Sequence, residues 1–265
     1  MRLFVFLLAA LVPVAHGQSD ERRVVSPDGS VEFRISIAPP ESGDYLQRLA
    51  YEVWAQGKPV IARSYLGLDI WLQEPLLGEN DGITGTSRGS GPGYNSLAAH
   101  YMQNGSIGRL LDIEARAYND GVAFRYALPL STPLQELLIT DEATEFRFTH
   151  AIQAPLQQKP PLVVNQPGGG WVGITEVPLA SFPAMLLARL DSNAVVTRLP
   201  PMPNRPGRAY EGATPFTGPW RVIAFGKDGQ SPQDLDFRAQ ILHFPRICTH
   251  VRFRAPEQND QSPPF

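Results

Sequence analysis

Apolar and polar residues alternate along much of this chain. Residues 31–37 alternate at every step, and residues 49–55 place Leu49, Tyr51 and Val53 on one face. A period of two residues is that of a β-strand with one face against a core and the other toward solvent. Both segments are therefore predicted to be strands.

The clearest hairpin lies between residues 111 and 128, where two alternating runs flank Asn119-Asp120-Gly121. Asn119 and Asp120 are predicted to be turn formers rather than sugar ligands, because both residue types favour tight turns. Further strands are expected at residues 144–149, 171–175, 184–190, 194–199 and 220–225. No segment has a convincing helical period longer than two turns. The pattern predicts an all-β fold, a large antiparallel β-sandwich.

Composition agrees with one large β domain. The 265 residues include 26 prolines and 23 glycines spread along the chain, as a turn-rich β protein requires. The net charge of −3 is small and evenly distributed, which argues against nucleic acid or an anionic membrane as a partner. Cys248 is the only cysteine, so stability is expected to come from the β core rather than from a disulfide within the chain.

The first residues have the pattern of an export signal. Arg2 precedes the apolar residues 3–14, and Ala15-His16-Gly17 then supplies small residues where a signal peptidase reads. The apolar run is shorter than the roughly 20 residues that span a bilayer. We expect a signal peptide over residues 1–17, cleaved after Gly17, and a mature protein that is periplasmic or secreted, with no membrane partner.

Two strings that look catalytic are set aside on their context. Residues 85–89 spell G-x-S-x-G, but a nucleophile elbow needs a strand before it and a helix after it, and residues 89–93 are Gly-Ser-Gly-Pro-Gly. A flexible loop is predicted there. Residues 168–173 fit G-x-G-x-x-G, yet Pro178 and Pro183 exclude the helix that a dinucleotide site needs. No nucleotide site is expected.

Histidines and aromatic residues give weaker indications. The histidines are too far apart in sequence to suggest a zinc site: His100, His150, His243 and His250. Aromatic residues in predicted loops could stack on sugar rings, although such side chains more often cover the edge of a core: Tyr94, Tyr101 and Trp171.

Glu176 is a single carboxylate that follows an apolar run and precedes Pro178 and Pro183. Because proline lacks a donor N–H and fixes φ, no helix continues here, and Glu176 is predicted to lie on a strand end or in a loop. Taken alone, a glutamate at a strand end is usually a solvated surface residue.

A set of phrases, taken together and in order, gives Glu176 a context. They are residues 26–33 (SPDGSVEF), 64–68 (SYLGL), 116–126 (RAYNDGVAFRY), 174–176 (ITE) with 182–185 (FPAM), and 214–223 (TPFTGPWRVI). The set resembles the N-terminal domain of glycoside hydrolase family 97, secreted bacterial α-glucosidases and α-galactosidases. The resemblance implies a galactose mutarotase-like β-super-sandwich over residues 24–230. Residues 231–265 resemble nothing in the family and are expected to be a divergent, partly disordered tail.

The resemblance also implies what this chain contributes. Family enzymes carry their catalytic carboxylates on a (β/α)8 barrel that follows this domain, so no catalytic residue is assigned here. The N-terminal domain of the calcium-dependent members supplies one glutamate to a Ca²⁺ shared with the barrel, and Glu176 matches that position. Because Ca²⁺ takes about six to eight oxygens, a barrel on a separate chain would have to complete the site. We expect a truncated, exported domain associated with α-glucosides or α-galactosides and not catalytic alone.

Two other functions remain open from the sequence. A mutarotase-like sugar epimerase would need a histidine acid and a glutamate base, for which His100 or His150 with Glu176 are the candidates. An interaction module without sugar chemistry would use the sheet edge that a barrel would otherwise cover.

Overall fold

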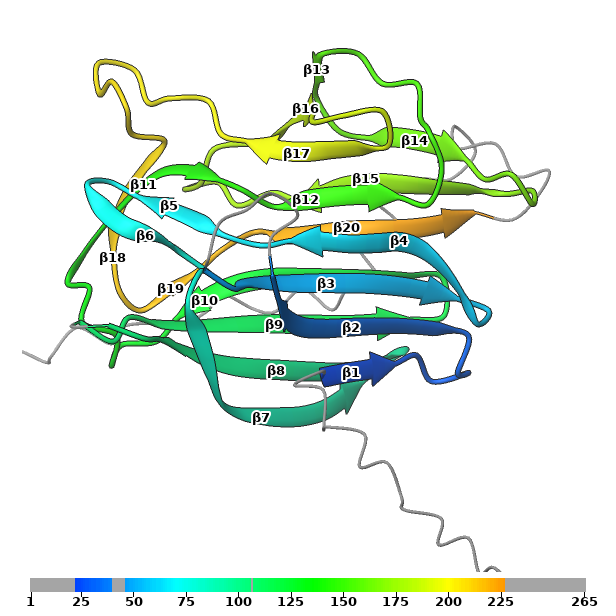
Figure 1. Cartoon of the computed structure of the whole chain (residues 1–265), viewed down its shortest axis with the longest axis horizontal. Helices are drawn as coiled ribbons and strands as arrows, with labels where there is room; N and C mark the ends of the chain where they lie inside the picture. Colours follow the sequence, from blue (N-terminus) through cyan, green and yellow to red (C-terminus); the bar gives the residue numbers. More distant parts are fainter. Residues whose placement is uncertain (1–21, 40–45, 106, 227–265) are drawn as a thin grey trace, which may run out of the picture.

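A computed structural model of the chain describes residues 22–39, 46–105 and 107–226 (Figure 1). The expected signal peptide, the tail over residues 231–265, His243, His250 and Cys248 lie outside these ranges. The described residues form β-strands and no α-helix, and the paired strands run antiparallel. This confirms the predicted all-β sandwich. Across the described residues, no helix has the length and apolar character needed to cross a membrane.

The sandwich consists of two large sheets and one small one. In spatial order, the first sheet contains β1 (Arg22–Val25), β2 (Val31–Ala38), β3 (Arg48–Ala55), β4 (Lys58–Tyr65), β12 (Glu145–Phe148), β17 (Ala194–Arg198), β16 (Leu186–Arg189) and β13 (Gln157–Gln158). The second contains β14 (Leu162–Asn165), β15 (Trp171–Val177), β20 (Trp220–Gly226), β10 (Gly121–Leu128), β9 (Leu110–Tyr118), β8 (Tyr94–Gln103) and β7 (Asp81–Gly91), with β19 (Phe216–Thr217) also paired to β10.

The small sheet lies at one end of the sandwich, on the left in Figure 1. It contains β18 (Tyr210–Ala213), β11 (Glu136–Glu142), β5 (Leu68–Ile70) and β6 (Gln73–Leu77). The tips of the β3–β4 and β14–β15 hairpins lie at the opposite end (Figure 1). The molecule therefore has two distinct ends at which loops and strand termini from both large sheets meet.

The segments with the clearest alternation are the strands that were predicted. β2 and β3 pair with Phe33 opposite Val53, and the predicted hairpin is β9–β10, with Tyr118 opposite Gly121 across the Asn119-Asp120 turn. The other five predicted strands correspond to β12, β15, β16, β17 and β20.

The prediction of a flexible loop at the G-x-S-x-G string is wrong. Those residues lie within β7, which pairs with β8 from Asp81 opposite Gln103 to Gly91 opposite Tyr94. The local sequence is rich in glycine and serine, and pairing with β8, whose alternate residues are buried, supplies the order that the segment lacks by itself. The turn comes after the strand, where Gly93 has a φ of 77°.

Aromatic side chains join the two large sheets. Phe124 of β10 lies with its ring centroid 4.8 Å from that of Tyr51 on β3 and 5.6 Å from that of Phe33 on β2. Phe146 of β12 completes the group at 6.4 Å from Phe124. All four side chains are buried, and the Tyr51 hydroxyl donates to the carbonyl oxygen of Glu145 at 2.6 Å. This packing holds the strand ends at which the candidate sites lie.

Candidate functional site

Glu176 lies at the penultimate position of β15, which confirms its predicted place at a strand end. Strand alternation puts its side chain on the same face as Val172 and Ile174, which are buried between the sheets. The carboxylate is therefore not the solvated surface group that a strand-end glutamate usually is: only 7% of the side chain is exposed.

Arg221 holds Glu176 from the neighbouring strand. It lies directly opposite Glu176 in the β15–β20 register, and its side chain is completely buried. Its Nη1 donates to Glu176 Oε2, while Nε donates to Glu142 Oε1 at 2.9 Å and Nη2 donates to Glu142 Oε2. Glu176 Oε1 accepts the backbone N–H of Met185 at 3.0 Å. Glu142, Glu176 and Arg221 are referred to below as the charge cluster.

A chain of hydrogen bonds from Gly67 through Tyr126 and Thr144 leads to Glu142. The backbone N–H of Gly67 donates to the Tyr126 hydroxyl at 2.9 Å, and that hydroxyl lies 2.7 Å from Thr144 Oγ1. Thr144 donates its hydroxyl proton to Glu142 Oε1 at 2.7 Å. The Thr144 hydroxyl has one proton, which it donates to Glu142. The Tyr126 hydroxyl is therefore the donor in its hydrogen bond with Thr144. The chain thus ends on Glu142 as an acceptor, as an ionised carboxylate requires.

The charges of the cluster are unequal. Burial alone would lower the pKa of the Arg221 guanidinium, but the carboxylates of Glu142 and Glu176 outweigh burial and raise this pKa above its ordinary value. Arg221 therefore stays protonated at any working pH. The two glutamates bring two formal negative charges against the one positive charge of Arg221, so the formal charge of the cluster is negative at the end of the sandwich.

Glu176 retains one free lone-pair site on each carboxylate oxygen for an outside partner. Each of its carboxylate oxygens accepts one hydrogen bond from within the chain, and a carboxylate oxygen has two lone-pair sites. Among the described residues, no group of three or more His, Cys, Asp or Glu side chains is arranged to hold a metal ion. Glu176 can thus offer a single ligand, and any cation there would need further oxygens from another source.

The histidines considered with Glu176 have other partners. His100 Nδ1 lies 2.8 Å from Asp112 Oδ1, and His150 Nε2 lies 3.1 Å from the carbonyl oxygen of Asn165. Neither histidine is a hydrogen-bond partner of Glu176, whose described partners are Arg221 and Met185. Among the described residues, no hydrogen bond joins either candidate acid, His100 or His150, to the candidate base Glu176.

His100 also lies 3.4 Å from Ser87 Oγ of the G-x-S-x-G string, so serine, histidine and aspartate form a row across β7, β8 and β9. The serine–histidine contact is at the long limit of a hydrogen bond. Ser87 also lies in mid-strand on an exposed face rather than on a strained strand-to-helix turn. We assign this row no catalytic role.

Two of the aromatic residues expected in loops lie in a strand instead, and the third begins a strand that was predicted. Tyr94 and Tyr101 belong to β8, and Trp171 is the first residue of β15. Tyr101 and Trp171 are buried, which favours their role as cover for the core. Tyr94 is partly exposed, and its ring lies 4.6 Å from the guanidinium carbon of Arg116.

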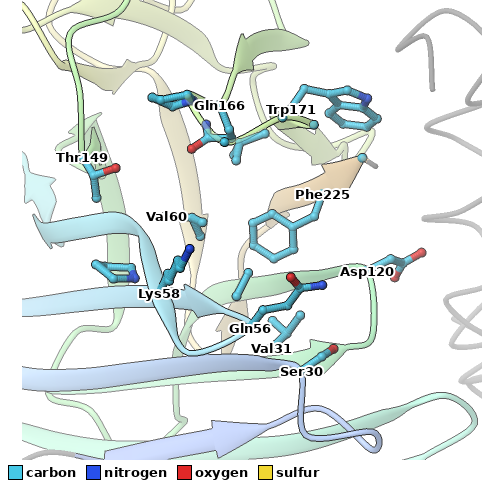
Figure 2. A pocket seen from close by; sticks show the side chains of 18 of the residues that line it. Ser30, Val31, Gln56, Lys58, Val60, Asp120, Thr149, Gln166, Trp171 and Phe225 are labelled. Atoms are coloured by element: carbon cyan, nitrogen blue, oxygen red, sulfur yellow. The ribbon is translucent and has the colours of Figure 1, made fainter. Parts of the chain in front are cut away.

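A cavity of about 600 Å³ opens at the other end of the sandwich (Figure 2). Its walls come from the β1–β2, β3–β4, β9–β10 and β14–β15 turns together with the end of β20. The polar side chains of the lining are Ser30, Gln56, Lys58, Asn119, Asp120, Thr149 and Gln166. This cavity was not predicted from the sequence. Its sequence signal was the Gly168-Gly169-Gly170 run, which forms a turn of the cavity wall.

Comparison with known proteins points to one family. The profile described as Glycosyl-hydrolase 97 N-terminal matches residues 24–160. A curated relative, the retaining alpha-galactosidase of Bacteroides thetaiotaomicron, is 27% identical over 158 residues. That match covers 56% of this chain and 22% of the relative, so the chain spans about a fifth of the relative's length.

Solved structures agree on the fold. A glycoside hydrolase family 97 enzyme from Pseudoalteromonas sp. strain K8, in complex with acarbose, has a TM-score of 0.65 and 22% identity, covering 78% of this chain and 36% of that enzyme. A beta-arabinopyranosidase has a TM-score of 0.62 and 20% identity, covering 77% and 40%. Since the family profile covers more than half of the sequence, the chain belongs to the glycosyl-hydrolase 97 N-terminal family.

Proposed function

We propose that this chain is the exported, non-catalytic β-sandwich part of a family 97 α-glycosidase. It packs on a catalytic (β/α)8 barrel and gives that barrel one calcium-ligand glutamate, Glu176. The substrate class is an α-glucoside or α-galactoside. The observation that carries the proposal is the fixed carboxylate of Glu176 at the end of the sandwich, where each oxygen accepts one hydrogen bond from within the chain and keeps one lone-pair site.

The chemistry of the charge cluster fits calcium. Ca²⁺ prefers carboxylate oxygens and takes about six to eight of them, so one glutamate supplies a fraction of its shell. Glu142 offsets the positive charge of Arg221, and the remaining negative charge of the cluster favours a nearby cation. A Ca²⁺ completed by barrel carboxylates would polarise or position a substrate oxygen. The role of this chain is to hold the Glu176 carboxylate in place through Arg221 and the Met185 N–H.

Calcium titration tests the proposal. The mature chain is titrated with Ca²⁺ by calorimetry, alone and mixed with a separately expressed family 97 barrel. The chain alone is expected to bind weakly, because one carboxylate leaves most of the coordination to water. The mixture should bind more tightly, and Glu176→Ala should remove the gain.

Glu136→Ala is the matched control. Glu136 is an exposed glutamate on β11, so its loss should leave the gain from the barrel unchanged. Tight binding by the chain alone, or a mixture whose affinity survives Glu176→Ala, would show that Glu176 is not the ligand.

A further inference from the structure

We propose that the cavity at the hairpin end binds a short neutral saccharide, at a site separate from Glu176. Trp171 and Val172, at the start of β15, line the cavity, whereas Glu176 lies near the end of the same strand. Trp171 and Glu176 are five residue steps apart along the strand, so their Cα atoms are about 17 Å apart at the usual rise per residue. The inference goes beyond calcium ligation and does not depend on it.

Gln166 provides the sharpest reason to expect a polar ligand. Its Nε2 is buried and has no hydrogen-bond partner in the described part of the protein. Buried amide groups are nearly always paired, so an unpaired one inside a cavity wall indicates a place for an external acceptor. The turn holds Gln166 in position, since its backbone N–H donates to the Gly170 carbonyl oxygen at 2.9 Å and its own carbonyl accepts from Gly169 at 3.0 Å.

The charges of the lining favour a neutral ligand. Lys58 and Asp120 are the charged side chains of the lining, one of each sign, and both are exposed. The other polar groups are amides and hydroxyls, which donate and accept hydrogen bonds without charge: Gln56, Asn119, Gln166, Ser30 and Thr149. Such a set matches the closely spaced hydroxyls of a pyranose better than it matches a phosphate or a carboxylate.

Phe225 supplies the apolar side of the site. Its ring is partly exposed in the cavity, and Figure 2 shows it between Gln56, below it in the view, and Gln166, above it. An aromatic ring face packs on the C–H face of a pyranose while neighbouring amides bond its hydroxyls. The cavity volume lies within the range of roughly 300 to 1,000 Å³ typical of small-molecule sites, which leaves room for one or two sugar units.

Saturation-transfer difference NMR on the complete mature chain tests the proposal, with maltose and melibiose as probes. At least one sugar should give a transfer signal and a saturable titration. Gln166→Ala should reduce the signal or weaken the affinity at least about tenfold, as expected when a buried amide loses its ligand. Gln157→Ala removes a matched exposed glutamine of β13 and should change nothing. Thermal melts of both variants verify that the fold is kept.

Several results would overturn the site. These are no transfer from either sugar, an unchanged titration curve in Gln166→Ala, or stronger binding of glucuronate than of the neutral sugars. Glu176→Ala should leave the sugar signal intact, so failure here is distinguishable from failure of the calcium proposal.

Discussion

At the scale of single residues, Arg221 is the side chain that holds the charge cluster together. It is completely buried and compensates two carboxylates that lie on different sheets, Glu142 on β11 and Glu176 on β15. Removing one partner of a buried ion pair is much more harmful than never having had the pair, because the other charge remains without compensation. Arg221 is therefore expected to be both a structural residue and the group that orients Glu176.

Arg221→Met should lower the free energy of unfolding by about 3 to 5 kcal/mol, the usual cost of leaving buried charges unpaired. Urea denaturation of the chain without residues 1–17 measures this loss. Arg208→Met is the matched control, since Arg208 pairs with Glu211 at 2.7 Å where both side chains are more exposed. A pair of that kind is worth at most about 1 kcal/mol. Equal losses in the two variants would contradict the structural role of the cluster.

Asp81 is a second residue whose charge matters, at the start of β7. Only 5% of it is exposed, so its carboxylate is largely shielded from water. Burial raises the pKa of Asp81 from 3.8 to about 7, the charge of Arg109 and a hydrogen bond from the Gly78 backbone N–H oppose the rise, and Glu79 adds to it. Arg109 donates instead to the Oε1 atoms of Gln103 and Gln73, at 2.7 and 3.2 Å.

The pKa of Asp81 predicts a pH dependence of stability. Because the pKa is higher in the folded chain, the folded state binds the proton more tightly than the unfolded state does. Its contribution to stability is fully present below about pH 4 and is lost as pH rises through about 7.

Asp81→Asn should remove this part of the slope and be the more stable protein at pH 7.5, by an amount on the order of a few kcal/mol. Asp120→Asn, in an exposed turn, should keep the wild-type slope. Thermal melts of the wild type and the two variants between pH 4 and 8 measure how the stability of each protein depends on pH. A slope that Asp81→Asn leaves unchanged would assign the pH dependence to other groups.

At the scale of the elements, prediction succeeded where a strand has one buried face. β2 and β9 alternate because each packs one face on the core, and the local sequence shows that pattern. β10 is buried on both faces, and the Asn119-Asp120-Gly121 turn after β9 helped to locate it. β7 was missed because its order comes from β8, and glycine and serine carry no strand signal of their own. β4 begins with Lys58 and Pro59, and β5 is only three residues long. Neither segment therefore shows the two-residue alternation that predicts a strand.

The candidate sites could be predicted only in part, for a related reason. Glu176 was predicted to lie at a strand end. Its pairing with Arg221, 45 residues later in the chain, depends on β15 lying beside β20. Glu142 joins them from a third strand. The cavity is similarly built from turns distant in sequence, and local patterns do not report which turns meet at one end of a sandwich.

At the scale of the whole molecule, the two ends of the sandwich carry different chemistry. The end with the small sheet holds the charge cluster, which suits contact with a larger partner that completes a cation site. The opposite end holds the neutral cavity, which suits a small ligand. A domain of this family with both features would join a catalytic partner at one end and retain a sugar at the other, with the aromatic core between them fixing their separation.

The last prediction concerns catalysis by the chain alone. Glycoside hydrolysis needs two carboxyl groups about 5 to 9.5 Å apart that reach the scissile bond from either side. Glu142 and Glu176 are the carboxylates that converge here, but both bind the same buried arginine, and Glu142 is almost completely buried. Neither can approach a glycosidic oxygen without breaking the cluster. The chain without residues 1–17 should therefore release no 4-nitrophenol from 4-nitrophenyl α-glucoside or α-galactoside.

Adding a family 97 barrel should supply the hydrolysis, and Glu176→Gln should reduce the rate of the mixture without changing the melting of this chain by more than a few degrees. The chain without a barrel is the decisive sample. Release of 4-nitrophenol that Glu176→Gln abolishes there would mean that the glutamate leaves Arg221 and acts on substrate directly. The sandwich would then be an enzyme in its own right, and N-terminal sequencing of the active material would show whether it is the processed chain that carries the activity.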